Sequence, residues 1–121
     1  MTQLRAVLLA QGGEDIVARY EPDLETLLAR GRLMTSPVTY RPMEESSCHG
    51  NVSRLWLDKA LGITAIATGY GLSDDALWRQ HSWAVLEDGL LETTKMRVLY
   101  FGVALEGVEA DRFAKTNATV A

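Results

Sequence analysis

Cys48 is the residue whose type and position best fit a nucleophile, and the sequence holds no second cysteine. Apolar side chains recur at helical spacing from Cys48 to Leu61, so we expect the thiol at the first turn of a helix. The positive end of a helix and its exposed N–H groups favour a thiolate, whereas Glu44 and Glu45 just upstream oppose it. Free cysteine is also among the most often buried residue types, so an inert core thiol is the competing interpretation.

Two histidines are available to take the thiol proton. His49 follows Cys48 directly and points about 100° away around the helix, which favours a surface position. His81 opens an apolar strand in which His81, Trp83 and Val85 alternate onto one face. We expect the helix that begins at Cys48 to cover the sheet containing this strand, so thiol and imidazole could meet there. A histidine satisfied within the core is the alternative for His81.

Glu92 is the candidate to orient the His81 imidazole, and its position depends on the hairpin before it. A two-residue turn at Asp88-Gly89 puts Glu92 on the face of His81 but four residues along, roughly 13 Å away. A wider loop pairs Val85 with Leu90 and makes Glu92 a diagonal neighbour, roughly 7–8 Å from His81 between backbones. A Cys-His-Glu triad therefore requires the second register. An exposed strand glutamate is the alternative.

The elements that must position these residues change in type along the chain. Helices are predicted from residue 2 to the glycines at 12 and 13, around residues 16–20, and from Pro22 to Gly31. The stretch 33–47 is predicted to be an ordered loop. Strands are predicted at 63–70, 82–86, 90–94 and 98–105, and the remainder from Gly107 is weakly helical at best. Helices followed by an antiparallel meander of about four strands indicate an α+β fold.

Length and composition predict a single domain over residues 1–121. Lys and Arg number 12 against 16 Asp and Glu, and this acidic balance argues against nucleic-acid binding by phosphate neutralisation. No apolar run approaches the length of a membrane-spanning helix, and no signal peptide is recognisable at the N-terminus. A single cysteine without a partner is typical of a reducing, cytoplasmic compartment.

Five short segments, taken together in their order, resemble the papain-like, transglutaminase-like group of thiol enzymes. More narrowly, they are similar to small uncharacterised bacterial and phage proteins with Cys-x-x-Asn, a Gly-Tyr strand, His-x-Trp and Asp-x-Thr in that order. The segments are Cys48-His49-Gly50-Asn51, Ile66-Ala67-Thr68-Gly69-Tyr70, His81-Ser82-Trp83, Leu91-Glu92-Thr93-Thr94 and Tyr100-Phe101-Gly102-Val103.

The resemblance covers residues 48–104 as a papain-like catalytic core and leaves the helical N-terminal residues 1–47 unexplained. It implies Cys48 as nucleophile, His81 as general base and Glu92 as the group that orients His81. Glu92 stands where an aspartate is usual, and the longer side chain lengthens its reach.

Three further residues are candidates for contact with a substrate. Asn51 lies one turn after Cys48 and could line the site, or it could tie the helix to the segment 33–47. Trp78 and Arg79 belong to a predicted loop that leads into His81, and such loops often carry recognition. A core aromatic is the alternative for Trp78. The backbone N–H of Cys48 is the natural oxyanion donor, and the sequence identifies no second one.

Metal ligation is disfavoured because the paired Cys or His spacings of zinc sites are missing, and no phosphate-binding loop is present. We therefore expect no cofactor. The predicted function is that of a cysteine-dependent hydrolase or acyl transferase for amide, ester or thioester carbonyls. Its substrate would be a small molecule, a peptide terminus or a carrier-bound acyl group. The alternative is a non-catalytic binding or accessory protein that retains a papain-like shell. Homo-oligomerisation through the N-terminal helices is compatible with both.

Overall fold

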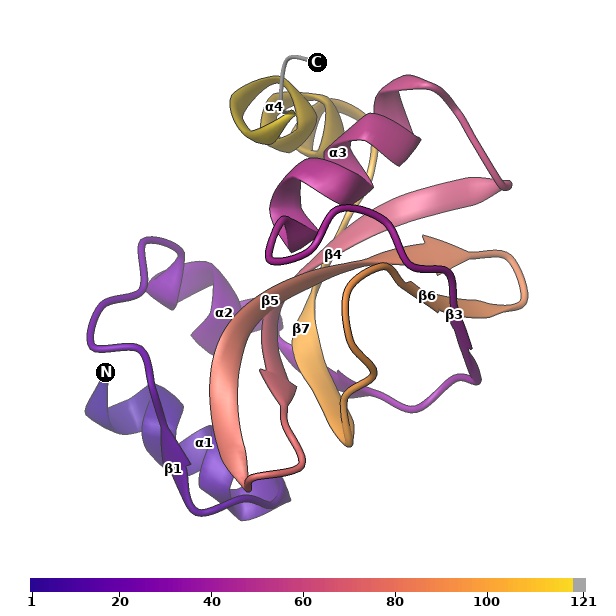
Figure 1. Cartoon of the computed structure of the whole chain (residues 1–121). Coiled ribbons are helices and arrows are strands. Elements are labelled where there is room, and N and C mark those ends of the chain that lie inside the picture. The colour runs from indigo at the N-terminus through magenta and orange to yellow at the C-terminus, as the bar shows by residue number, and fades with distance from the viewer. Residues whose placement is uncertain (119–121) are drawn as a thin grey trace. The chain divides into compact units, whose positions relative to one another are not determined.

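The computed structural model describes residues 1–118 of the 121-residue chain and confirms the α+β class. Helices occupy both ends of the described chain, and a third helix begins at Cys48 (Figure 1). The elements in chain order are α1 (Thr2–Gln11), β1 (Asp15–Ile16), α2 (Leu24–Arg30), β2 (Arg32–Met34), β3 (Val38–Tyr40), α3 (Cys48–Leu57), β4 (Ile63–Leu72), β5 (Leu77–Leu86), β6 (Gly89–Glu92), β7 (Leu99–Leu105) and α4 (Gly107–Asn117).

The sheet is mixed, so the prediction of about four antiparallel strands was wrong. Among the described residues it has seven strands in the order β2-β7-β4-β5-β6-β3, and β1 pairs with β5 off this path. Of the three additional strands, β1 and β3 pair in parallel, with β5 and β6 respectively, and β2 pairs antiparallel with β7. Each is only two or three residues long, which is too short to show strand periodicity in a sequence.

Residue contacts group the chain into two compact units, which we describe separately. The first unit consists of Met1–Thr35, Gly69–His81 and Arg97–Val103. The second unit consists of Ser36–Thr68, Ser82–Met96 and the described residues from Ala104 onward. The expectation of one domain over the whole chain stays a prediction.

In the first unit, α1 ends at a pair of glycines, as predicted. Gly13 has a φ of 79°, and a Cβ atom there would lie 2.8 Å from a Leu72 methyl carbon and 2.9 Å from the indole nitrogen of Trp78. A larger residue would therefore be strained at this position and would also collide with its neighbours. The pair lets the chain turn closely past Trp78, whose indole N–H donates to the carbonyl of Gly12.

The helix predicted around residues 16–20 is absent, because this backbone bonds to β5 instead. The N–H group of Glu14 donates to the carbonyl of Ala76, and that of Val17 donates to the carbonyl of Trp78. These bonds flank the short strand β1, and the extended backbone that pairs with β5 cannot be helical over the same residues. The following helix, α2, ends at Gly31 as predicted.

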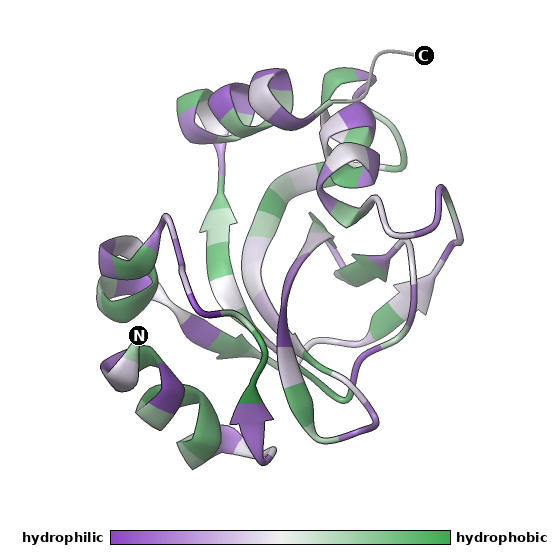
Figure 2. Ribbon diagram, turned by 60° about the vertical axis from the view of Figure 1, so that its left-hand side comes forward, coloured by the Kyte–Doolittle hydropathy of each residue, from purple (hydrophilic) through white to green (hydrophobic). Residues whose placement is uncertain are grey.

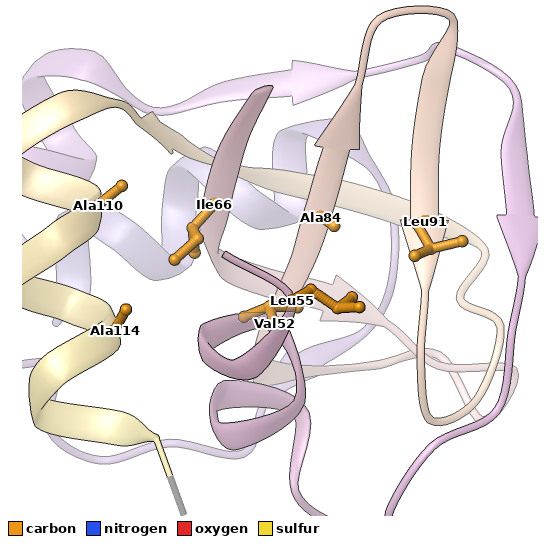
Figure 3. Packing of buried hydrophobic residues seen from close by; sticks show 7 residues of the cluster. All are labelled: Val52, Leu55, Ile66, Ala84, Leu91, Ala110 and Ala114. Atoms are coloured by element: carbon orange, nitrogen blue, oxygen red, sulfur yellow. The ribbon is translucent and has the colours of Figure 1, made fainter. Parts of the chain in front are cut away.

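In the second unit, α3 and α4 pack over the sheet through a core of small and branched side chains. The side chains come from α3, α4, β4, β5 and β6, and Figure 3 shows them gathered between the helices and the sheet. The cluster comprises Val52, Leu55, Ile66, Ala84, Leu91, Ala110 and Ala114. Hydrophobic and hydrophilic residues alternate around the turns of α3 and α4, as in helices that bury one face (Figure 2).

Helix α3 begins at Cys48 as predicted but ends at Leu57, before the expected Leu61. Lys59, Leu61 and Gly62 all have positive φ angles, and this left-handed backbone cannot continue an α-helix. The chain after Gly107 is a full helix of 11 residues rather than a weakly helical tail.

The β5–β6 hairpin has the register that brings Val85 opposite Leu90, and Leu86 pairs with Gly89. Its turn is therefore formed by residues 87 and 88, one position earlier than predicted. Gly89 is not part of the turn but allows a close approach, since a Cβ atom there would lie 2.4 Å from the carbonyl oxygen of Pro37. This close approach allows the Leu90 N–H to bond to that same carbonyl, next to the parallel pairing of β3 with β6.

Candidate active site

Cys48 is the first residue of α3 and its side chain is half-buried. Ser47 is the N-cap residue, but its side chain does not cap the helix. Its backbone carbonyl accepts the first helical bond, from the N–H of Asn51 at 2.8 Å. The thiol therefore lies at the positive end of the helix, where a thiolate is favoured, and remains partly accessible.

Glu92 is the last residue of β6, and its side chain has no exposed surface. Its Oε2 atom accepts hydrogen bonds from the Thr94 N–H at 3.0 Å and from the Thr94 hydroxyl at 3.1 Å. A buried carboxylate needs such donors, because burial without them disfavours its charged form. The alternative of an exposed strand glutamate is thereby wrong.

Asn51 joins three segments around the start of α3. It is 5% exposed, and its Nδ2 group donates to the carbonyl of Glu44 at 2.9 Å and to the Thr93 hydroxyl at 3.2 Å. Glu44 precedes Cys48 and Thr93 follows Glu92, so one amide ties the loop before the thiol to the end of β6. The tie to the segment 33–47 that we expected is present, and a substrate contact for Asn51 stays a prediction.

His49 is half-buried rather than a surface residue. Its Nδ1 atom lies 2.5 Å from the Ser82 hydroxyl oxygen, and the Ser82 hydroxyl donates to the Thr68 hydroxyl oxygen at 2.9 Å. The ring also meets the edge of Phe113 on α4, with centroids 5.8 Å apart and an interplanar angle of 75°. This network was missed in the sequence, where the only signal is a pair of hydroxyl residues, Thr68 and Ser82, inside apolar strands.

His81 lies on β5 and is 1% exposed. Gly71 provides space beside it: a Cβ atom on Gly71 would lie 3.2 Å from the Cδ2 atom of His81 and 2.7 Å from the Cγ atom of Arg97. The imidazole and the Arg97 stem thus both pack over this glycine. The Tyr100 ring also lies near the imidazole, with its centroid 6.2 Å from that of His81.

Trp78 and Arg79 are placed differently, although they are neighbours. Trp78 is fully buried, and its indole N–H donates to Gly12 O at 2.9 Å, which is the environment of a core aromatic. Arg79 is partly exposed and forms a two-point ion pair with Asp75, at 3.0 and 2.8 Å. Both residues belong to β5 rather than to the loop that we predicted.

The candidate residues are divided between the two units. Cys48, Asn51 and Glu92 belong to the second unit, and His81, Trp78 and Arg79 belong to the first.

Across residues 1–118 no group of three or more His, Cys, Asp and Glu side chains could hold a metal ion.

The first unit also contains a buried polar cluster that the sequence did not reveal. Glu21 is 8% exposed and accepts hydrogen bonds from the Tyr70 hydroxyl at 2.9 Å, the Gln80 amide at 3.1 Å and the Asp23 N–H at 2.8 Å. Burial and the adjacent Glu21 carboxylate raise the pKa of Tyr70 well above its ordinary value. The cluster holds the segment before α2 against β4 and β5.

A cleft of about 410 Å³ lies apart from these residues in the second unit, lined by Trp56, Leu57, Lys59, Ile63 and Asp111. The Trp56 indole N–H donates to Asp111 at 2.8 Å across one side of it. None of the predicted site residues lines this cleft.

No known protein family, curated protein or solved structure matches the chain. Among the described residues, none of the helices has the length and apolar character needed to cross a membrane.

Proposed function

We propose that the protein is a cysteine-dependent hydrolase or acyl transferase with a papain-like Cys-His-Glu triad, acting on an amide, ester or thioester carbonyl. Cys48 is the nucleophile, His81 the general base and Glu92 the group that orients His81. No cofactor takes part, and the reducing conditions of the cytoplasm would keep the thiol available.

The β5–β6 register supports this assignment most directly. Two registers were compatible with the sequence, and only the one pairing Val85 with Leu90 suits a triad; the hairpin has that register. Continued by two positions, it sets Glu92 opposite Trp83, which shares strand parity with His81. In a triad built on this register, His81, two residues before Trp83 on the same strand face, would be the diagonal neighbour of Glu92.

The environment of the thiol supports the same assignment. Cys48 starts α3 and is half-buried, so the residue combines partial exposure with a position at the positive end of a helix. We assign its own backbone N–H, which belongs to the first turn, as the donor to the oxyanion.

In the proposed reaction His81 accepts the proton of the Cys48 thiol as the sulfur bonds to the carbonyl carbon. The tetrahedral adduct collapses, the bond to the leaving nitrogen, oxygen or sulfur breaks, and His81 returns the proton to it. Water or an amine then attacks the thioester while His81 takes its proton, and the carbon–sulfur bond breaks as that proton returns to the Cys48 sulfur. Substrates would be a small molecule, a peptide terminus or a carrier-bound acyl group, and Arg79 is the more accessible of the two predicted contact residues on β5.

A non-catalytic accessory protein is the second candidate, and the burial of His81 favours it. An imidazole that is 1% exposed has almost no surface to present to a substrate, which is the environment of a structural histidine in a core. In that case Cys48 would have the reactivity of an ordinary thiol.

The rate of Cys48 alkylation by iodoacetamide, followed by intact mass over a range of pH, tests the proposal. The single cysteine makes the mass shift specific to this site. An active triad should label rapidly below pH 7, and His81→Ala should abolish this acid-side reactivity. Glu92→Gln should weaken it without removing the thiol's reaction at high pH. A midpoint near the ordinary thiol pKa of about 8.5 that His81→Ala leaves unchanged would eliminate the enzyme and favour the accessory protein.

A further inference from the structure

The residues that follow the proposed nucleophile and the proposed base bond to each other. His49 follows Cys48, Ser82 follows His81, and the His49 Nδ1 atom lies 2.5 Å from the Ser82 Oγ atom. We propose that His49 is a positioning residue, which holds the first turn of α3 on β5 so that the Cys48 sulfur has one fixed place. This inference rests on the proposed function, because it assigns a purpose to the placement of the thiol.

The direction of the hydrogen bonds defines the protonation of the His49 ring. The Ser82 hydroxyl has one proton, which it donates to the Thr68 oxygen at 2.9 Å. With that direction the Ser82 oxygen accepts from His49, which corresponds to the tautomer with a proton on Nδ1. In this tautomer Nδ1 is a donor and cannot take the proton of the thiol.

The His49 ring is held from more than one side. Ser82 is completely buried at the sheet surface, and Phe113 of α4 meets the ring edge-on. The backbone of the residue is held as well, since the buried Ser53 hydroxyl donates to the His49 carbonyl at 2.7 Å. Because adjacent Cα atoms are only about 3.8 Å apart, a shift of His49 moves Cys48 with it.

The His49–Ser82 bond also limits how far the start of α3 can move. Position 49 lies in the first turn, where helices fray most readily and few backbone bonds resist movement. Asn51 secures the loop before the helix, but it does not bond to β5. The His49–Ser82 bond supplies the attachment of this turn to the strand that carries the proposed base.

Substitutions at position 49 distinguish an effect of the hydrogen bond to Ser82 from an effect of side-chain size or charge. His49→Asn keeps an N–H donor at the place of Nδ1, because Nδ2 of asparagine is the same number of bonds from Cα. His49→Ala removes the donor, and Ser82→Ala removes its acceptor. We expect alkylation of Cys48 to slow by roughly tenfold or more in the two alanine variants, since small misplacements of a reacting group carry large rate penalties. His49→Asn should stay within about twofold of the wild type, and the double alanine variant should slow no further than either single one.

Equal labelling rates in wild-type protein and both alanine variants would overturn the inference, as would His49→Asn behaving like His49→Ala. The outcomes remain distinct from those for the enzyme: if His81→Ala leaves the pH profile unchanged the triad fails, whereas fast labelling of His49→Ala in a protein with a working triad rejects the positioning role alone.

Discussion

The Tyr70 hydroxyl donates a 2.9 Å hydrogen bond to Oε1 of Glu21, and neither side chain has more than slight contact with solvent. The bond joins β4 to the segment that precedes α2. Hydrogen bonds to charged acceptors contribute about 1.5–3 kcal/mol, so Tyr70→Phe should lower the free energy of unfolding by about that amount at neutral pH. Urea denaturation of the wild type and of Tyr70→Phe measures this difference in the free energy of unfolding.

The same pair predicts how stability depends on pH in the alkaline range. Burial and the Glu21 carboxylate raise the pKa of Tyr70 above its ordinary value of 10.0 in the folded protein, whereas the unfolded chain keeps the ordinary value. The unfolded state therefore loses its proton first, and the free energy of unfolding should fall above pH 10 by at most about 1.4 kcal/mol per pH unit. Below pH 10 the contribution is fully present.

Tyr70→Phe should remove this alkaline loss, and Tyr40→Phe should retain it, because Tyr40 is 48% exposed and bonds to a backbone carbonyl. Parallel pH profiles for the wild type and Tyr70→Phe would contradict the assignment.

Asn51 should be important for stability because its amide has two partners in a buried environment. Asn51→Ala leaves Glu44 O and the Thr93 hydroxyl without that donor, and we expect a loss of about 2 kcal/mol in the free energy of unfolding. Asn117→Ala is a matched control, since its amide bonds to Phe113 O on the half-exposed end of α4. Its effect should be below about 1 kcal/mol. Equal losses in the two variants would disprove the tie made by Asn51.

Substitution by alanine should lower stability by different amounts at two glycines of β4. A Cβ atom on Gly69 would lie 2.3 Å from Phe101 O and 2.6 Å from the Gly102 Cα atom, so the backbone of β7 would have to move. Gly69→Ala should cost about 3 kcal/mol or prevent folding. At Gly71 the nearest atoms belong to the flexible Arg97 side chain, so Gly71→Ala should be milder in thermal denaturation while shifting the NMR signals of His81. The reverse order of stability would refute this account.

The ion pair of Asp75 and Arg79 predicts a titration that NMR can follow. Hydrogen bonds from the Arg79 guanidinium are the main cause that lowers the pKa of Asp75 to about 2. Because the folded pKa is depressed, the pair contributes fully above pH 3.8 and is lost as the pH falls toward 2. In Arg79→Gln the carboxyl carbon of Asp75 should titrate close to 3.8. An unchanged midpoint would mean that another group holds the carboxylate.

Features that depend on neighbouring residues could be predicted from the sequence. The starts and ends of α1, α2 and the start of α3 follow from apolar spacing and from glycines such as Gly12 and Gly31. The register of β5 with β6 was one of two considered alternatives. In the observed register Gly89 lies directly beside the carbonyl of Pro37, where a Cβ atom would collide with it. Pro37 is far from the hairpin in sequence, so the hairpin alone could not reveal it.

Features that depend on distant residues could not be predicted. Strands β1 and β3 owe their existence to parallel partners, and their own residues are too few to show a pattern. The bond between His49 and Ser82 joins residues 33 positions apart, and either residue alone is unremarkable as a histidine or a serine. The same holds for Glu21, whose partners come from β4 and β5.

The parallel pairing of β3 with β6 has a consequence for the order of folding. Val38 and Leu90 are partners although about fifty residues separate them, and α3 lies within that loop. The β5–β6 hairpin needs only a short closure, so it should form early, and β3 should dock late, after the intervening chain has collapsed. Pulse-labelling hydrogen exchange during refolding should therefore protect the Leu91 amide before the Arg41 amide, which bonds to Glu92 only once β3 has docked.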